Sequence, residues 1–336
     1  MVKKISRRQL LGDMTTAAGA GLLLGGCEAS KTEPTATSKT AGAAASGATS
    51  TASATATSAA SATATSAASP NSVVQVEHRS VVDDDRNVDP GAVRDMLRQG
   101  VTRLLGGPEP LEKLFAPTDR VGLKINCLGR KLLHTHHELV QAVASELQAV
   151  GIPAQNILVW DRFGGHMKQC GYELREDPKA MRYLATEERG REGGRFDPNA
   201  SYVWEKDRAD GHAESGSASR LSSLFTSECD KHINLAILKD HALAGVTLCL
   251  KNIAYGVCDN NRRFHGRDMI HPFIADFCAR DDVKKKFVLH VIDGLEGCFD
   301  DGPAPKSRSK LFRPQTLWLG TDPVALDSVG ARVIEA

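Results

Sequence analysis

Two lysines interrupt apolar segments in the second half of the chain. Lys239 follows the apolar run "INLAIL" and precedes Asp240 and His241, and Lys251 stands beside Asn252 in "LCLKNIAYG". A lysine in apolar surroundings needs a counter-charge or a ligand, because burial of an unpaired charge is costly. We predict that Lys239, Lys251 and Asn252 bind an anionic ligand. His241 is the predicted proton carrier, since a histidine beside lysines suits acid–base catalysis.

Charged or amide residues follow other apolar runs in the same way. Lys124 and Asn126 occur in "VGLKIN", Asp161 ends "ILVWD", Asp293 ends "VLHVID", and Asp322 follows "LWLG". The carboxyl ends of parallel strands share one edge of a sheet, and ligands bind there. We expect these residues to converge on one crevice, where Lys124 and Asn126 bind ligand. Asp161 and Asp293 are candidate metal ligands, and an N-cap role is the open alternative for Asp322.

A charged loop, "CDNNRRFHGRDMIH", follows the segment that contains the second lysine. Its Cys, Asp and His residues are metal-ligand types, but their spacing matches no standard metal site. An anionic ligand facing Arg263 and His265 is the other interpretation. We predict that Arg263 binds the ligand and that His265 is a second catalytic histidine, both closing over the crevice.

The segments around these residues show alternating strand and helix periodicity. Strands are predicted at residues 72–81, 119–126, 156–161, 233–238, 286–293 and 315–320, and helices at 89–107, 136–151, 244–256, 271–280 and 322–336. Several strands are apolar throughout. This pattern predicts an α/β domain over residues 73–336, with a mostly parallel sheet covered by helices on both faces. Residues 165–230 have no clear period and are interpreted as an irregular insertion or extended loops.

The N-terminus has the features of an export signal. Residues 1–27 combine a basic start, the pair Arg7 and Arg8, a short apolar stretch and "LGGC", which is similar to a lipobox ending at Cys27. Residues 28–72 are rich in Ala, Ser and Thr and are predicted to be a disordered tether. The expected product is a lipoprotein anchored to the membrane through Cys27, in the periplasm or on the outer cell surface.

Composition excludes some classes of protein. The net charge is +1 and aromatic residues make up 5% of the chain, which gives neither the basic surface nor the stacking platform of a nucleic-acid binder. No cysteine lies in a C-x-x-C pair, so an iron–sulfur cluster bound by this chain is not expected. Most cysteines are interpreted as small buried apolar residues.

The motifs resemble those of a known family. "VGLKIN", "ILKDHALAGVTLCLKNIAYG", "VIDGLEG" followed by "DGP", and "GTDPVALDSVGA" resemble, in this order and spacing, the domain of unknown function 362 (DUF 362) family. The resemblance implies an α/β fold and an association with iron–sulfur proteins, and it brings no established reaction. In layout alone, strand-end lysines and histidines are similar to the site of nickel-pincer racemases, so a metal or organometallic cofactor stays open.

Three classes of function compete at this point. The first is an enzyme, redox-associated in some form, that binds an anionic small molecule or a metal-containing cofactor at the carboxyl edge of its sheet. The second is a non-catalytic ligand-binding or electron-transfer accessory lipoprotein that docks a redox partner protein. The third, a structural surface lipoprotein, leaves the charged crevice unexplained. The order "SRRQLL" around Arg7 and Arg8 resembles a twin-arginine export signal. Twin-arginine export carries folded proteins, which favours a protein that acquires a cofactor before export.

Overall fold

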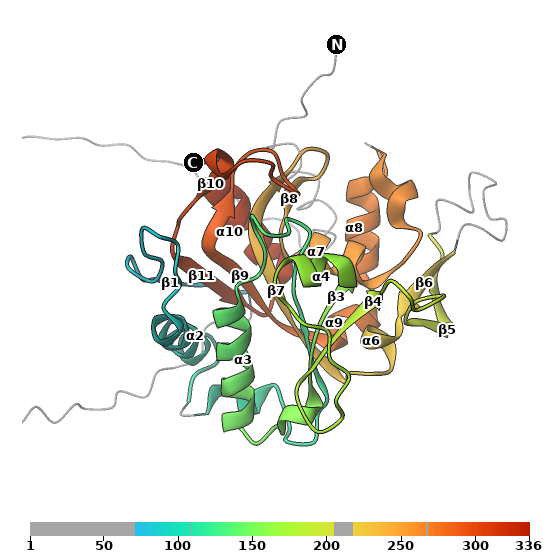
Figure 1. Ribbon diagram of the computed structural model, residues 1–336, viewed down its shortest axis with the longest axis horizontal. Coiled ribbons are helices and arrows are strands. Elements are labelled where there is room, and N and C mark those ends of the chain that lie inside the picture. The colour runs from blue at the N-terminus through green and yellow to red at the C-terminus, as the bar shows by residue number, and fades with distance from the viewer. Residues whose placement is uncertain (1–70, 108, 205–217, 267) are drawn as a thin grey trace, which may run out of the picture.

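The computed structural model describes residues 71–107, 109–204, 218–266 and 268–336 (Figure 1). The predicted export signal with Cys27, and the predicted tether up to residue 70, lie outside the described residues. Within the described part of the chain, no helix is long and apolar enough to cross a membrane.

The core of the fold is a nine-stranded sheet with the order β1-β11-β9-β7-β2-β3-β4, in which β8 pairs with β7 and β10 pairs with β9. Its strands are β1 (Val74–Glu77), β2 (Val121–Lys124), β3 (Ile157–Phe163), β4 (Arg182–Glu187), β7 (Lys231–His241), β8 (Gly245–Thr247), β9 (Phe287–Cys298), β10 (Leu311–Phe312) and β11 (Thr316–Gly320). The pairings from β9 through β7, β2 and β3 to β4 are all parallel, whereas β11 and β1 are antiparallel at one side. The prediction of a mostly parallel α/β sheet is confirmed.

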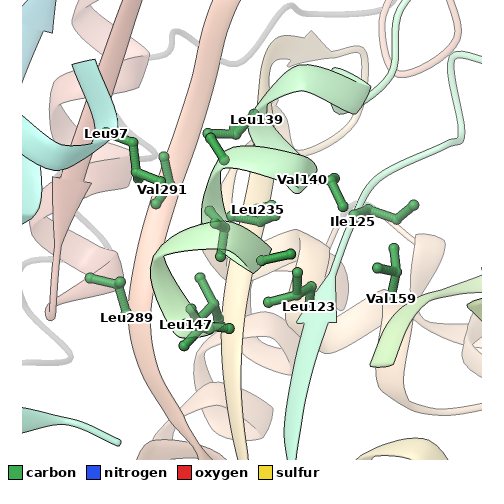
Figure 2. Close-up of a cluster of buried hydrophobic side chains, with 14 of the residues drawn as sticks. Leu97, Leu123, Ile125, Leu139, Val140, Leu147, Val159, Leu235, Leu289 and Val291 are labelled. Atoms are coloured by element: carbon green, nitrogen blue, oxygen red, sulfur yellow. The ribbon is translucent and has the colours of Figure 1, made fainter. Parts of the chain in front are cut away.

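Helices cover both faces of this sheet. They are α2 (Pro90–Leu105), α3 (His137–Ala149), α4 (Gly164–Gln169), α6 (Ser223–Thr226), α7 (Cys249–Val257), α8 (Ile270–Ala279), α9 (Asp281–Lys286) and α10 (Pro323–Glu335). On one face α2 and α3 pack against the sheet, and Figure 2 shows Leu139 and Leu147 of α3 beside Leu235 of β7 and Leu289 of β9. On the other face α7, α8 and α9 share one apolar cluster, and α10 packs on β7 and β9. The sheet is therefore buried on both sides, which explains its continuous apolar runs.

Asp322 is an N-cap and lies away from the predicted crevice. Its side chain accepts hydrogen bonds from Val324 N at 2.8 Å and from Ala325 N at 3.4 Å at the start of α10. Because β11 runs antiparallel to β9, Gly320 pairs with His290, near the beginning of β9. Asp322 therefore follows the opposite edge of the sheet, and its expected place in the crevice was wrong.

Two strands are longer than their apolar runs predicted. β7 continues through Lys239, which pairs with Thr247 of β8, and β9 continues to Cys298. Asp293 consequently lies within β9, not at its end. The glycines after it allow the extension: a Cβ at Gly294 would lie 2.3 Å from the side chain of Trp318 on β11. The same Cβ would lie 2.9 Å from the backbone oxygen of Thr316, so only glycine fits at this position.

Residues 165–230 contain more regular structure than expected. β4 joins the main sheet parallel to β3, while β5 (Phe196–Tyr202) and β6 (Ser219–Ser222) form a separate two-stranded sheet. The interpretation as extended loops was wrong for β4. Its apolar part is short and flanked by charged residues, so its periodicity could not be distinguished from that of a loop.

Candidate functional site

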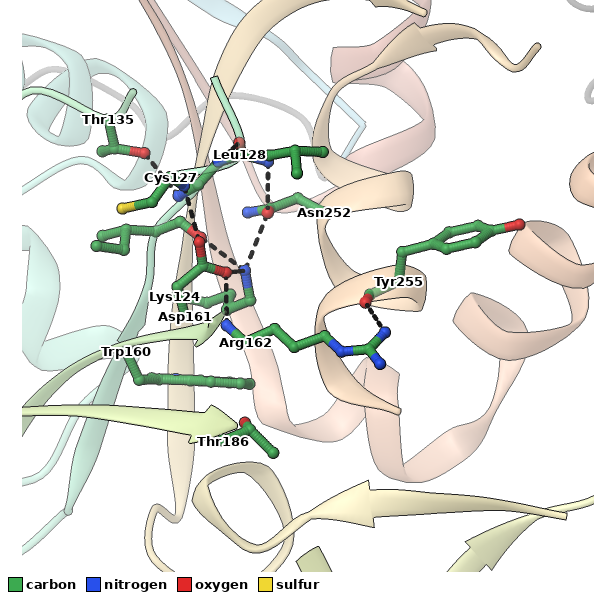
Figure 3. Close-up of polar contacts among 12 residues, drawn as sticks. Lys124, Cys127, Leu128, Thr135, Trp160, Asp161, Arg162, Thr186, Asn252 and Tyr255 are labelled. Carbon is green, nitrogen blue, oxygen red and sulfur yellow. Dashed lines mark hydrogen bonds and ion pairs between the residues drawn. The ribbon is translucent and has the colours of Figure 1, made fainter. Parts of the chain in front are cut away.

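The carboxyl end of β2 carries a buried lysine whose hydrogen bonds are complete. The side chain of Lys124 is 1% exposed, and its ammonium donates to Asp161 Oδ1 at 2.7 Å, to Ile125 O at 2.6 Å and to Asn252 Oδ1 at 3.0 Å (Figure 3). An ammonium has three N–H donors, so all three are used. Lys124 therefore joins β2, β3 and α7, and its predicted role as a direct ligand contact would require these bonds to change.

Asparagines extend this network to Lys239. Lys239 Nζ donates to Asn126 Oδ1 at 2.7 Å, and Asn126 Nδ2 donates to Asn252 Oδ1 at 3.0 Å. Asn252 in turn donates to Asn234 Oδ1 at 2.8 Å. Burial lowers the pKa of Lys239 to about 8, and the negative charge of Asp161 opposes this effect. Its ammonium keeps N–H donors beyond the one that Asn126 accepts.

The two predicted metal ligands are not brought together. Asp161 accepts from Lys124 and, through Oδ2, from Cys127 N at 2.7 Å, whereas Asp293 accepts from the ring and backbone nitrogens of His136 at 2.8–3.0 Å. Across the described ranges, no group of three or more His, Cys, Asp or Glu side chains is placed to hold a metal ion. A metal site shared by Asp161 and Asp293 is therefore not supported, because each carboxylate is neutralised by a different cationic or hydrogen-bonding neighbour.

Lys251 on α7 is a buried amine without a counter-charge. The residue is 5% exposed, and its Nζ lies 4.2 Å from the centroid of the Tyr255 ring, one helical turn further along. Among the residues that the structure describes, no carboxylate or other acceptor is within hydrogen-bonding distance of this nitrogen. Burial, and then the positive charge of Lys239, lower the pKa of Lys251 to about 7.

His241 is held as a neutral hydrogen-bond donor. Its Nδ1 accepts from Leu243 N and from Ala244 N, each at 3.0 Å, which assigns the ring proton to Nε2. Burial lowers its pKa to about 2, and Lys251 and His265 add to the effect. His241 is therefore suited to donate a hydrogen bond to an anion, and its role as the proton carrier stays a prediction.

His265 has the opposite tautomer and contacts the same aromatic ring as Lys251. Its Nδ1 lies 3.2 Å from Asn261 O, which assigns the proton to Nδ1 and leaves the lone pair on Nε2. The ring packs edge-on against Tyr255 at 4.6 Å. Burial lowers the pKa of His265, and Lys251 lowers it further. Of the two predicted catalytic histidines, His265 is the one with a ring nitrogen free to accept a proton.

Arg263 contacts a different part of the loop. Its guanidinium donates to Ser219 Oγ at 2.9 Å and to Asn260 O, and it lies 4.0 Å from the ring of Phe264. These contacts hold it beside β6, and it does not contribute to the pKa shifts of Lys251 or His265. The structure therefore does not place it with the lysines, and its predicted ligand contact stays a prediction.

Sequence reasoning missed residues that shape this site. Tyr255 supports both Lys251 and His265, and Arg162 donates to Tyr255 O at 3.4 Å and adds positive charge near His265. The spacing of Lys251 and Tyr255, four residues apart in a predicted helix, was an available signal. A cavity of about 30 Å³, enough for one water, also borders Lys251; its lining residues are Ala244, Val246, Leu250, Lys251, His271, Ile274, Ala275 and Asp327.

The comparison with protein families agrees with the fold. A family described as Domain of unknown function (DUF362) matches residues 121–332, more than half of the chain. The chain belongs to this family. The match begins at β2 and ends within α10, so it spans the whole lysine network. None of the curated proteins matches the chain significantly.

Proposed function

We propose that this DUF362 protein binds an anionic small molecule at the carboxyl edge of its sheet, beside Lys251. One observation carries the proposal. Lys251 is 5% exposed, and within the described residues its amine forms no ion pair and lies over the ring of Tyr255. The charged groups that shift the pKa of Lys251 and of His241 are all basic. A buried amine whose charged neighbours are basic fits an anionic ligand.

The same cluster supports proton transfer on the bound anion. Lys251, with a pKa lowered to about 7, exchanges its proton near neutral pH. The Nε2 lone pair of His265 is a second proton acceptor, and the Nε2–H of His241 is a donor that stabilises negative charge. The proposed activity is therefore acid–base chemistry on a small anion, with Lys251 and His265 as the catalytic residues and Lys239 as a further contact.

The donor set also limits the kind of cofactor. Ammonium groups repel a bare metal cation, and amide and imidazole N–H groups do not bind one. Metal cations take oxygen, thiolate or neutral imidazole nitrogen ligands. A metal-containing cofactor fits this site only if it presents anionic groups to Lys251 and Lys239.

The test is to identify what the purified protein carries. The chain is isolated anaerobically and denatured, and the released material is analysed by mass spectrometry and elemental analysis. We expect an anionic compound in stoichiometric amount, absent from Lys251→Met and present in Lys284→Met, in which an exposed lysine of α9 is changed. Equal recovery from both variants would overturn the proposal. So would an empty wild-type protein that binds neither inorganic phosphate nor succinate in calorimetry.

We further propose that the protein is exported and lipid-anchored. The support is the pair Arg7 and Arg8 followed by the apolar stretch and the lipobox-like "LGGC" at Cys27. Changing both arginines to Lys is expected to retain the precursor in the cytoplasm, and Cys27→Ser is expected to release the protein from the membrane fraction. Membrane attachment that persists in both variants would contradict this proposal.

A further inference from the structure

Two buried thiols meet beside the lysine network, although they are far apart in the sequence. Cys127 follows β2, and Cys170 ends α4. Cys170 Sγ donates a hydrogen bond to Cys127 O at 3.6 Å, and each thiol shifts the pKa of the other. Both are free cysteines. A thiol that lies beside the backbone of a second cysteine can be joined to it as a disulfide when the Cα separation is short enough.

His134 completes this pair as a proton acceptor. Its Nδ1 lies 2.8 Å from Arg130 O, which assigns the ring proton to Nδ1, and its side chain lowers the pKa of Cys170. The remaining nitrogen, Nε2, is therefore the atom that can take the thiol proton. His134 is half-buried, so this proton has a route to solvent. A thiol with an adjacent histidine is the arrangement that generates a reactive thiolate.

The two thiols have different acidities. Contact with Cys127, and then with His134, lowers the pKa of Cys170 to about 6 even though burial opposes the shift. Burial raises the pKa of Cys127 instead. The difference assigns the attacking role to Cys170 and the resolving role to Cys127.

The other described cysteines lack this environment. Burial raises the pKa of each of them, and none hydrogen-bonds to a second thiol; they are Cys229, Cys249, Cys258, Cys278 and Cys298. Cys170 itself is 6% exposed. A surface hollow of about 390 Å³ borders Gly171, the residue after Cys170.

We propose that Cys127 and Cys170 form a dithiol site that exchanges electrons with disulfide substrates. The Cys170 thiolate, its proton passed to His134, attacks a disulfide RSSR, forms a mixed disulfide and expels one thiolate. Cys127 then loses its proton and attacks Cys170 Sγ, which forms the Cys127–Cys170 disulfide and expels the second thiolate. The balance is two thiols and RSSR giving one protein disulfide and two RSH, with two electrons passing to RSSR.

This site is separate from the anion site but touches the network that supports it. Cys127 N donates to Asp161 Oδ2 at 2.7 Å, and Asp161 is the ionic partner of Lys124. Formation of the disulfide constrains the backbone beside this ion pair. The proposal does not depend on the identity or existence of the anionic ligand.

The test uses an aromatic disulfide, 5,5′-dithiobis(2-nitrobenzoic acid), on the full chain under native conditions. Wild-type protein is expected to release two thiolates from this site and to yield a Cys127–Cys170 linked peptide that dithiothreitol reverses. Cys127→Ser is expected to release one and to stop at the mixed disulfide on Cys170. Cys229→Ser, a buried cysteine without a thiol neighbour, is expected to behave as wild type.

The pH dependence separates a reactive site from adventitious oxidation. The first release is expected to have its midpoint near pH 6, the pKa of Cys170, whereas an ordinary thiol titrates near 9. His134→Gln is expected to move this midpoint to higher pH, an effect that a purely structural role of His134 would not produce. The proposal would be overturned if native wild-type protein gave no Cys127–Cys170 linked peptide at any ratio of reagent to protein. It would also be overturned if the linked peptide formed only in denaturant, whatever the variants do.

Discussion

Replacement of Lys251 by Met is expected to stabilise the protein while removing its ligand site. Burial lowers the pKa of this lysine from 10.5 to about 7, and each pKa unit corresponds to about 1.4 kcal/mol. At pH 7 the buried amine therefore costs the folded state on the order of 4 kcal/mol. Met keeps an apolar stem of similar length beside Tyr255 and carries no charge. After allowance for imperfect packing and the lost ring contact, we expect Lys251→Met to raise the free energy of unfolding at pH 7 by about 1–3 kcal/mol.

The lowered pKa of Lys251 also predicts how the free energy of unfolding changes with pH. The pKa of Lys251 is lower in the folded protein than in the unfolded chain, so the unfolded state binds more protons between about pH 7 and 10.5. Wild-type stability should therefore rise with pH across that interval. The advantage of the Met variant should fall by about 3 kcal/mol between pH 7 and pH 9.5, because the wild-type amine is then largely neutral in the folded state.

The assay is urea unfolding followed by tryptophan fluorescence at pH 7, 8 and 9.5. Lys284→Met is the matched control, because Lys284 is exposed on α9, and its unfolding free energy should equal that of wild type at each pH. Lys239 titrates in all three proteins, so differences between them isolate the changed residue. A Met variant less stable than wild type by more than about 1 kcal/mol at pH 7, or a difference that stays constant with pH, would refute the reasoning.

Three further predictions concern the residues around this site. In Gly256→Ala the new Cβ would lie 2.5 Å from Lys124 Cε, which should break the ion pair and lower the unfolding free energy in urea by about 3–5 kcal/mol; an unchanged midpoint would contradict this. Asp161→Asn leaves Lys124 buried with its charge unpaired and should have a similar cost, so a loss below about 1 kcal/mol would contradict the assignment of a buried pair. For His136, burial lowers the pKa but Asp293 outweighs it and raises the pKa above 6.5. The stabilisation is therefore present below pH 6.5 and lost at higher pH, as thermal unfolding between pH 6 and 8 should show for wild type but not for His136→Asn.

The sequence by itself was sufficient to predict the positions of most helices and strands, and which of the two each segment forms. Apolar runs and helical spacing placed β2, β3, α2 and α3. The helix predicted at residues 89–107 corresponds to α2, and the side chain of Asp89 caps it by accepting from Gly91 N and Ala92 N. The sequence also singled out lysines in apolar segments. These features depend on residues close together in the chain, so local patterns are sufficient to predict them.

The direction of strand pairing was decided only by the tertiary structure. An apolar run predicts burial on both faces but does not specify whether the neighbouring strand is parallel. β11 proved antiparallel, and this placed Asp322 at the opposite edge of the sheet from Lys124. The strand ends of β7 and β9 were missed for a related reason, because both strands are extended by pairing with β8 and β10.

The hydrogen-bond partners of the polar residues were also decided only by the tertiary structure. Lys239 and Asn126 are separated by 113 positions, and His136 and Asp293 by 157. No local pattern distinguishes a lysine whose N–H groups are all accepted, such as Lys124, from one whose amine has no acceptor among the described residues, such as Lys251. That distinction depends on which side chains the folded sheet and helix α7 bring within hydrogen-bonding distance, because a buried charge is stabilised only by the groups that surround it in space.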